Sequence, residues 1–121
     1  MDSDLKNNKL IHTSEACTKA RLAIQDTLDV VGGKWKLVLI SILMNGKKRF
    51  KELSREAGIS PRILSKELKE LEMNGLVIRK VCNTRPVTVE YSLSDYSKTL
   101  SPVITAMHQW GVAHRQKIIH G

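Results

Sequence analysis

One short basic segment of the chain has residue types and a spacing that suit recognition of a polyanion. If residues 59–75, ISPRILSKELKELEMNG, form a helix, Arg62, Lys66 and Lys69 share one face and Ser65 lies on its flank. Guanidinium, ammonium and hydroxyl groups on one helix face can donate hydrogen bonds to phosphate oxygens and to base edges. The pattern therefore favours contact with a nucleic-acid groove.

A basic helix face has a simpler interpretation, because many surface helices carry cations that contact only water. Glu67, Glu70 and Glu72 could also pair with these cations at i,i+3 or i,i+4 spacing. The charge of the whole chain argues against this interpretation. A formal net charge of +8 and a pI of about 9.7 favour a polyanionic partner, with nucleic acid ahead of an anionic membrane surface.

The position of each residue along the segment predicts whether it reads bases or contacts phosphates. Arg62, near the N-terminal end of a groove helix, can bind guanine O6 and N7 with both ends of its guanidinium. The predicted base-reading residues are Ser60, Arg62 and Ser65. Residues expected to contact phosphates, which position a protein without reading sequence, are Lys66, Lys69 and the cations around Phe50, namely Lys47, Lys48, Arg49 and Lys51.

The basic segment has the end signals of a single helix over residues 60–74. Ser60 is a favourable N-cap and Pro61 suits the first helical position. Gly75 suits the left-handed position that follows a helix. The opposite face carries an apolar stripe, Leu64, Leu68 and Leu71.

The elements around this helix predict a winged helix-turn-helix. Residues 17–31 and 34–45 are predicted helices, the second burying Trp35, Val38, Leu39 and Ile42. A short helix ending at Ala57, followed by Gly58, completes the helix-turn-helix. Residues 76–82 are a predicted strand, residues 83–86 a turn, and the alternation in residues 87–93 predicts a second strand, which together make a β-hairpin. The fold class is thus mainly α with a small β-hairpin (α+β).

The hairpin tip, residues 83–86, is the predicted wing, with Asn83, Thr84 and Arg85 as its candidate contacts. Arg85 could enter a narrow minor groove or contact the DNA backbone, or it could be an ordinary turn arginine. Arg79 and Lys80 lie on opposite faces of a strand, so at most one of them faces DNA.

The terminal helices are expected to form a two-fold dimer interface. Ser94 and Asp95 signal a last helical region, in which Pro102 either bends the helix or begins one capped by Ser101. The apolar residues of this last helical region have a spacing close to a heptad repeat. They could pack within their own subunit, but a small winged core would leave much of this apolar face uncovered, which favours a second copy as the partner. The predicted interface residues are Leu22, Leu28, Val103, Met107, Trp110 and His114.

Length and composition predict one domain, residues 16–121, preceded by a flexible arm at residues 1–15. The N-terminus does not resemble a signal peptide, and the longest apolar run, residues 37–44, is far shorter than the roughly 20 residues of a membrane span. We therefore expect a cytoplasmic protein without a membrane partner.

Enzymatic and metal-binding motifs are not recognisable in the sequence. His108, His114 and His120 recur every six residues, which places them on different faces of a helix, so they cannot share one metal ion. No nucleophile elbow, phosphate loop or cofactor fingerprint occurs. We predict no catalytic residue, no metal and no cofactor, and no pattern identifies a small-molecule effector.

Several segments in order resemble the HxlR-type winged-helix transcriptional regulators of the MarR-like superfamily: DVVGGKWKLVLISIL, GKKRFKEL, GISPRILSKELKELEMNGLV, PVTVEYSLS and the WG at 110–111. The resemblance covers roughly residues 29–114. It implies a homodimer that binds operator DNA, with a recognition helix at residues 60–69 in the major groove and dimerisation through the terminal helices.

Two positions differ from this family pattern. Ser97 stands where many relatives have glycine, and Leu22 stands where redox-sensing relatives have cysteine. Cys17, five residues earlier, is the remaining redox candidate, while both Cys17 and Cys82 also fit small hydrophobic positions. A redox- or electrophile-responsive regulator, and a protein-interaction winged helix that does not bind DNA, are the alternative hypotheses.

Overall fold

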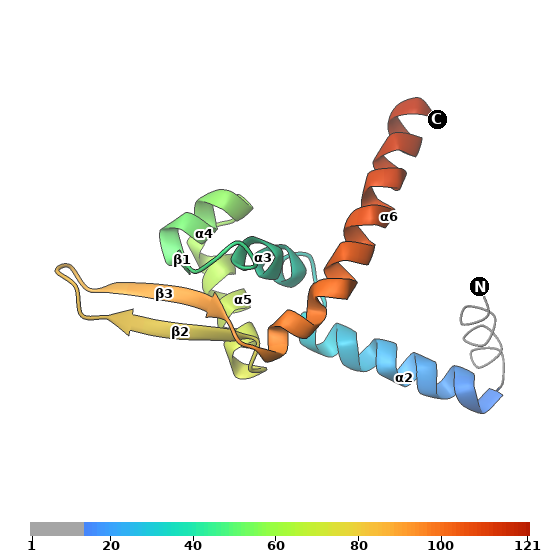
Figure 1. Cartoon of the computed structure of the whole chain (residues 1–121), viewed down its shortest axis with the longest axis horizontal. Coiled ribbons are helices and arrows are strands. Elements are labelled where there is room, and N and C mark those ends of the chain that lie inside the picture. Colours follow the sequence, from blue (N-terminus) through green and yellow to red (C-terminus); the bar gives the residue numbers. More distant parts are fainter. Residues whose placement is uncertain (1–13) are drawn as a thin grey trace. The chain divides into compact units, whose positions relative to one another are not determined.

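The computed structural model describes residues 14–121, and Figure 1 shows its helices and strands. Helix α2 (Ser14–Val31) belongs to one compact unit, and all elements from Lys34 onward belong to a second. The predicted arm at residues 1–15 falls mostly outside the described residues. Helix α2 begins at Ser14, three residues before the predicted start of the first helix.

The helix-turn-helix consists of α4 (Phe50–Ala57) and α5 (Pro61–Met73), which pack with α3 (Lys36–Leu43). The side chain of Ser60 caps α5 by accepting a hydrogen bond from the Ile63 N–H at 3.3 Å. Gly58 and Gly75 have φ of +68° and +72°, the left-handed conformation that glycine adopts without strain. The predicted end signals of α5 are confirmed.

The core lies between these helices and one face of the sheet. Helix α5 buries its predicted apolar stripe, Leu64, Leu68 and Leu71. The predicted buried face of α3 is confirmed for Leu39 but is wrong for Val38. Its buried residues are Lys36, Leu39, Ile40 and Leu43, whereas Val38 is 40% exposed. Because α3 is apolar nearly all round, its pattern does not distinguish the inward face from the outward one.

The sheet has three antiparallel strands in the order β1-β3-β2 (Figure 1). The predicted hairpin is confirmed as β2 (Val77–Cys82) and β3 (Thr88–Leu93), and Arg79 lies opposite Tyr91 in its register. Strand β1 (Lys48–Arg49) was not predicted, because two residues are too few to show an alternation. Strand β1 pairs with β3, which places the basic segment 47–51 along the sheet edge.

A 3₁₀ helix, η1 (Tyr96–Leu100), leads into α6 (Ser101–His120), which extends away from the hairpin in Figure 1. The Ser94 hydroxyl accepts a hydrogen bond from the Ser97 N–H at 3.2 Å, whereas the Asp95 side chain makes no capping bond. The N-cap of α6 is Leu100, so the alternative in which Ser101 caps a new helix is wrong. Pro102 lies in the first turn of α6, where its missing N–H has no helical partner to lose.

Candidate nucleic-acid interface

The exposed face of α5 carries the predicted basic group. The side chains of Arg62, Ser65, Lys66 and Lys69 are all exposed. The three cations lie on the side of the helix away from its buried leucines, and Ser65 lies on the flank. Within residues 14–121, neither Arg62, Lys66 nor Lys69 has an acidic partner within 4.0 Å. These cations are therefore available to an external anion.

Two glutamates of α5 are bound by a buried lysine of α3 and are not ion-paired with this group. The Lys36 ammonium donates to Glu67 at 2.7 Å and lies 2.5 Å from a Glu70 oxygen. The expectation that Glu67 and Glu70 could neutralise the basic face is thereby corrected. Lys36 fixes α5 against α3 and leaves the cations of α5 unpaired.

The ionisation of this cluster reflects its packing. Burial lowers the pKa of Lys36, but hydrogen bonds and charge attraction from Glu67 and Glu70 outweigh burial, so the pKa is raised above its usual value. The hydrogen bond from Lys36 lowers the pKa of Glu70 below its usual value, against a smaller effect of burial. Lys36 and Glu70 are therefore both charged at neutral pH.

The four cations of segment 47–51 are not brought together as one cluster. Lys47 lies 3.3 Å from Glu90, and Lys48 lies 2.9 Å from Glu56. The hydrogen bond to Glu56 raises the pKa of Lys48. Arg49 and Lys51 are exposed, and the Arg49 N–H donates to the Glu52 carboxylate at 3.0 Å. Arg49 and Lys51 are thus the freer candidates for phosphate contact.

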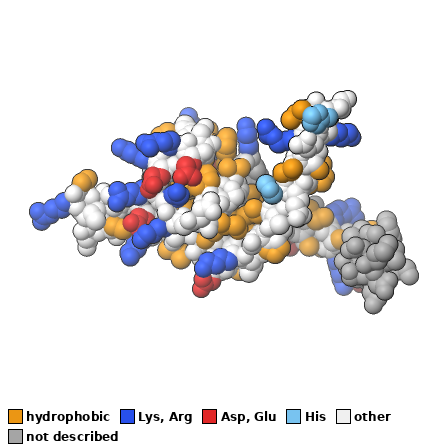
Figure 2. Space-filling model, turned by 45° about the horizontal axis from the view of Figure 1, so that its top comes forward, with side chains coloured by type: hydrophobic (Ala, Val, Ile, Leu, Met, Phe, Trp, Pro, Cys, Tyr) orange, Lys and Arg blue, Asp and Glu red, His pale blue; other side chains and the backbone are white. Residues whose placement is uncertain are grey.

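The hairpin tip is held by bonds within its own loop. The Thr84 hydroxyl donates to the Pro86 carbonyl at 2.8 Å and lies 3.1 Å from the Thr88 hydroxyl. Asn83 and Arg85 are exposed. Figure 2 shows cationic side chains at the tip and over the neighbouring elements, with acidic side chains between some of them. Thr84 therefore shapes the wing, while Asn83 and Arg85 remain free to contact DNA.

Arg79 is a candidate that the sequence could not single out. It lines a hollow of about 310 Å³ between α5 and the sheet, together with Ser65, Leu68, Lys69, Glu72 and Tyr91. The strand register puts Lys80 on the other face, opposite Glu90. Strand alternation in the sequence shows that at most one of Arg79 and Lys80 can face DNA. Only the packing of the sheet against α5 shows that Arg79 is that residue.

Lys36 was also missed, although a signal was present. Lys36, Leu39, Ile40 and Leu43 have the i, i+3, i+4, i+7 spacing of a buried helix face. A lysine in such a stripe requires a partner, and glutamates three residues apart in α5 provide one.

The predicted dimer-interface residues are exposed in this chain. On α2, Leu22 is 54% exposed and Leu28 is 58% exposed. On α6, Val103, Met107 and Trp110 are exposed, and the rings of Trp110 and His114 stack with centroids 4.8 Å apart. Each helix therefore presents apolar side chains that its own unit leaves uncovered.

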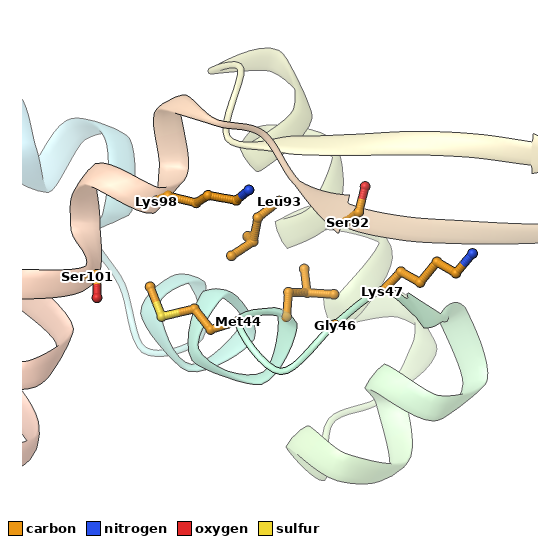
Figure 3. A pocket seen from close by; sticks show the side chains of 8 residues that line it. Met44, Gly46, Lys47, Ser92, Leu93, Lys98 and Ser101 are labelled. Atoms are coloured by element: carbon orange, nitrogen blue, oxygen red, sulfur yellow. The ribbon is translucent and has the colours of Figure 1, made fainter.

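A second hollow, of about 430 Å³, lies where α3, β3, η1 and α6 meet (Figure 3). Met44 and Leu93 line it with apolar atoms. The ammonium groups of Lys47 and Lys98 at its rim each lie 3.3 Å from an acidic partner, Glu90 and Asp95. No set of unpaired charges converges on this hollow, so no effector is assigned to it.

No three His, Cys, Asp or Glu side chains of residues 14–121 are grouped as metal ligands would be. None of the helices described here is both long and apolar enough to cross a membrane. Cys17 and Cys82 are both free thiols of intermediate exposure.

Comparison with known proteins gives the same fold and class. The family described as HxlR-like helix-turn-helix matches residues 30–118. The uncharacterized HTH-type transcriptional regulator YybR of Bacillus subtilis is 44% identical over 93 residues, 76% of this chain and 74% of that protein.

Two solved structures are similar to the chain over most of their length. The redox regulator HypR in its reduced form superposes with a TM-score of 0.75 at 41% identity, covering 82% of this chain and 99% of that one. The HTH-type transcriptional regulator YtcD gives a TM-score of 0.73 at 40% identity, covering 77% and 96%. The prediction of a winged helix-turn-helix regulator, and not an enzyme, is confirmed by these relatives. The chain belongs to the HxlR-like helix-turn-helix family of transcriptional regulators.

Proposed function

We propose that the chain binds operator DNA sequence-specifically as a homodimer. Helix α5 enters the major groove, and the tip of the β2–β3 hairpin contacts the adjacent minor groove or backbone. The observation that carries this proposal is the exposed basic face of α5, whose cations stay unpaired because Lys36 binds Glu67 and Glu70. Family membership supports the same partner.

The exposed residues take two roles in this complex. Arg62, Ser60 and Ser65 read base edges, since they lie in the first turns of a groove helix. Ser60 caps the helix as an acceptor, and its hydroxyl proton stays free to donate to DNA. Residues assigned to phosphates are Lys66, Lys69, Arg49 and Lys51, while Lys47 and Lys48 contribute less because they are paired with Glu90 and Glu56.

A titration of the protein against its own upstream DNA and against random duplex tests this function. We expect clear preference for one site at about 150 mM salt. If a dimer neutralises about 6–10 phosphates, log affinity falls with log salt at a slope of about −5 to −9. Equal affinity for random duplex would exclude sequence-specific binding and favour a winged helix that binds proteins instead.

The dimer is proposed to form through apolar faces on α2 and α6. Leu22 and Leu28 on α2, and Met107 and Trp110 on α6, are exposed in the single chain. Burying them against a second copy removes apolar surface from water. Sedimentation at micromolar concentration is expected to give twice the chain mass, and a monomer at that concentration would contradict the proposal.

A redox-responsive version is the second candidate, favoured by the similarity to HypR, which was solved in oxidised and reduced forms. Cys17 is a free thiol on α2, a proposed interface helix. Oxidation there would act on dimer geometry and so on DNA affinity. The test is DNA affinity under mild oxidant, for the wild type and for Cys17→Ser and Cys82→Ser. Equal affinity of the wild type in both states removes this candidate.

A further inference from the structure

The hollow between α5 and the sheet brings together donors from two consecutive elements, α5 and β2. Ser65 and Lys69 enter it from α5, and Arg79 enters it from β2. The largely buried Tyr91 and the buried Leu68 form the inner part of its wall. Its apolar wall and cationic rim suit a small anion better than a neutral ligand.

The charge of the hollow is not cancelled by neighbouring acids. Within the described chain, neither Lys69 nor Arg79 has an acidic group within 4.0 Å. Glu72 also lines the hollow, so two cations face one carboxylate there. The guanidinium of Arg79 can give a phosphate two parallel hydrogen bonds, which lysine cannot.

The position of the hollow relative to the DNA-binding elements indicates which anion fits. If α5 occupies a major groove and the hairpin tip reaches the adjacent minor groove, the sugar–phosphate strand that separates those grooves must pass between α5 and the hairpin. The hollow lies between these two elements, beside Ser65 and Lys69 of the basic face.

We propose that this hollow binds the DNA phosphate that separates the major groove occupied by α5 from the minor groove beside the wing. Arg79 and Lys69 are its charged donors, and Ser65, which is assigned to base readout, lines the hollow beside them. The inference rests on the proposed DNA-binding function and assigns Arg79 a role in it. Arg79 positions the protein and fixes the spacing between α5 and wing on the duplex, without reading a base.

The first test substitutes Arg79→Gln, with Lys80→Gln as the matched control on the opposite face of the same strand. Arg79→Gln is expected to weaken binding about tenfold on every sequence and to reduce the magnitude of the salt slope by about 1. Lys80→Gln is expected to change affinity less than twofold. Circular dichroism and the unfolding midpoint of both variants show whether they fold as the wild type does.

The second test removes the charge from the DNA. Duplexes carrying one neutral methylphosphonate at successive positions are titrated with the wild type and with Arg79→Gln. The wild type is expected to lose affinity when the substitution falls at the phosphate between the two grooves, and Arg79→Gln is expected to be insensitive at that position. This comparison remains informative if the variant is partly destabilised, because each protein is its own reference.

The possible results separate this inference from the proposed function. A wild type without site preference contradicts the proposed function itself. A wild type that binds its site, with Arg79→Gln no weaker than Lys80→Gln, overturns the phosphate site and leaves the function standing. An Arg79→Gln variant with altered base preference would also overturn it, because a phosphate contact carries no sequence information.

Discussion

Arg62 and Lys69 lie on the same exposed face of α5, two turns apart, yet they are expected to serve DNA binding differently. Arg62 is in the first turn, where a groove helix approaches base edges. Lys69 lines the hollow beside Arg79 and Ser65. Substitutions of Arg62 and of Lys69 can therefore be compared to separate base readout from positioning on the phosphates.

Arg62→Ala is expected to cost roughly 1–3 kcal/mol of binding free energy on the preferred site and to relax specificity at one base in each half-site. The reason is the loss of a bidentate contact to one base. Lys69→Ala is the control and is expected to weaken binding to all sequences alike. Affinities on a panel of singly substituted operators measure both, and a changed base preference in Lys69→Ala would reverse the two assignments.

The sequence predicts the position of a side chain when that position depends on one helix or strand alone. It does not predict the position when this depends on the packing of two elements. Arg62, Lys66 and Lys69 share a face by helical periodicity alone, so their grouping was predictable. The pairing of Lys47 with Glu90 and of Lys48 with Glu56 depends on the unpredicted strand β1. Arg79 likewise required the packing of a strand against a helix.

At the scale of elements, the position of α5 depends on its contact with α3. The leucine stripe of α5 is buried, and the Lys36 ammonium is bonded to two carboxylates on the flank of the same helix. The leucines contribute non-directional burial, whereas the ion cluster fixes rotation of α5 about its axis.

Lys36→Met is expected to destabilise the fold by about 3 kcal/mol, because Glu67 is then left poorly solvated without a partner. Denaturant unfolding followed by circular dichroism measures this loss. The triple variant Lys36→Met with Glu67→Gln and Glu70→Gln removes the unpaired charges and is expected to recover part of the stability. An unchanged midpoint in Lys36→Met would show that the cluster does not hold α5.

The Lys36–Glu70 ion pair is expected to stabilise the fold less as the pH falls into the acid range. The pKa of Glu70 is lowered in the folded protein, so its contribution is present above its usual value of 4.5 and is lost as pH falls through the lowered value. The raised pKa of Lys36 has the opposite consequence, and its contribution is lost only in strong alkali.

The stability difference between wild type and Lys36→Met should therefore be constant near neutral pH and shrink below about pH 4. Unfolding midpoints of both proteins across this range measure it. A difference that does not change with pH in acid would mean that the Lys36–Glu70 pair contributes nothing to stability.

The elements themselves were largely predictable, and the failures have a common physical reason. Helix α5 carries its own boundary signals in Ser60, Pro61 and Gly75, so its ends followed from local chemistry. The inward face of α3 is chosen by tertiary packing, because apolar residues surround that helix. The N-cap of α6 is Leu100 and not a serine, because the preceding 3₁₀ turn already holds the chain in a helical conformation.

At the scale of the whole molecule, DNA affinity is expected to depend on association of two copies. Two α5 helices about 34–36 Å apart would read successive major grooves of one duplex face. Doubling the phosphate contacts doubles the counterion release, which sets the salt dependence. The exposed apolar side chains of α2 and α6 are the proposed means of association.

Trp110→Glu is expected to convert the protein to a monomer, because it places a charge at the centre of the proposed α6 interface, where Trp110 is 69% exposed in the single chain. Tyr96→Glu, at a similarly exposed residue of η1, is the control. Sedimentation measures the mass, and the salt slope of DNA binding should fall to about half its value in the monomer. A dimer that persists in Trp110→Glu would place the interface elsewhere.

The most direct test of the account is selection of binding sites from a pool of random duplexes at about 150 mM salt, with wild type and Arg62→Ala in parallel. The wild type is expected to enrich a two-fold symmetric site with half-sites about one helical turn apart. Arg62→Ala is expected to lose preference at one base of each half-site. No enrichment by the folded wild type would contradict the claim that α5 reads a DNA sequence.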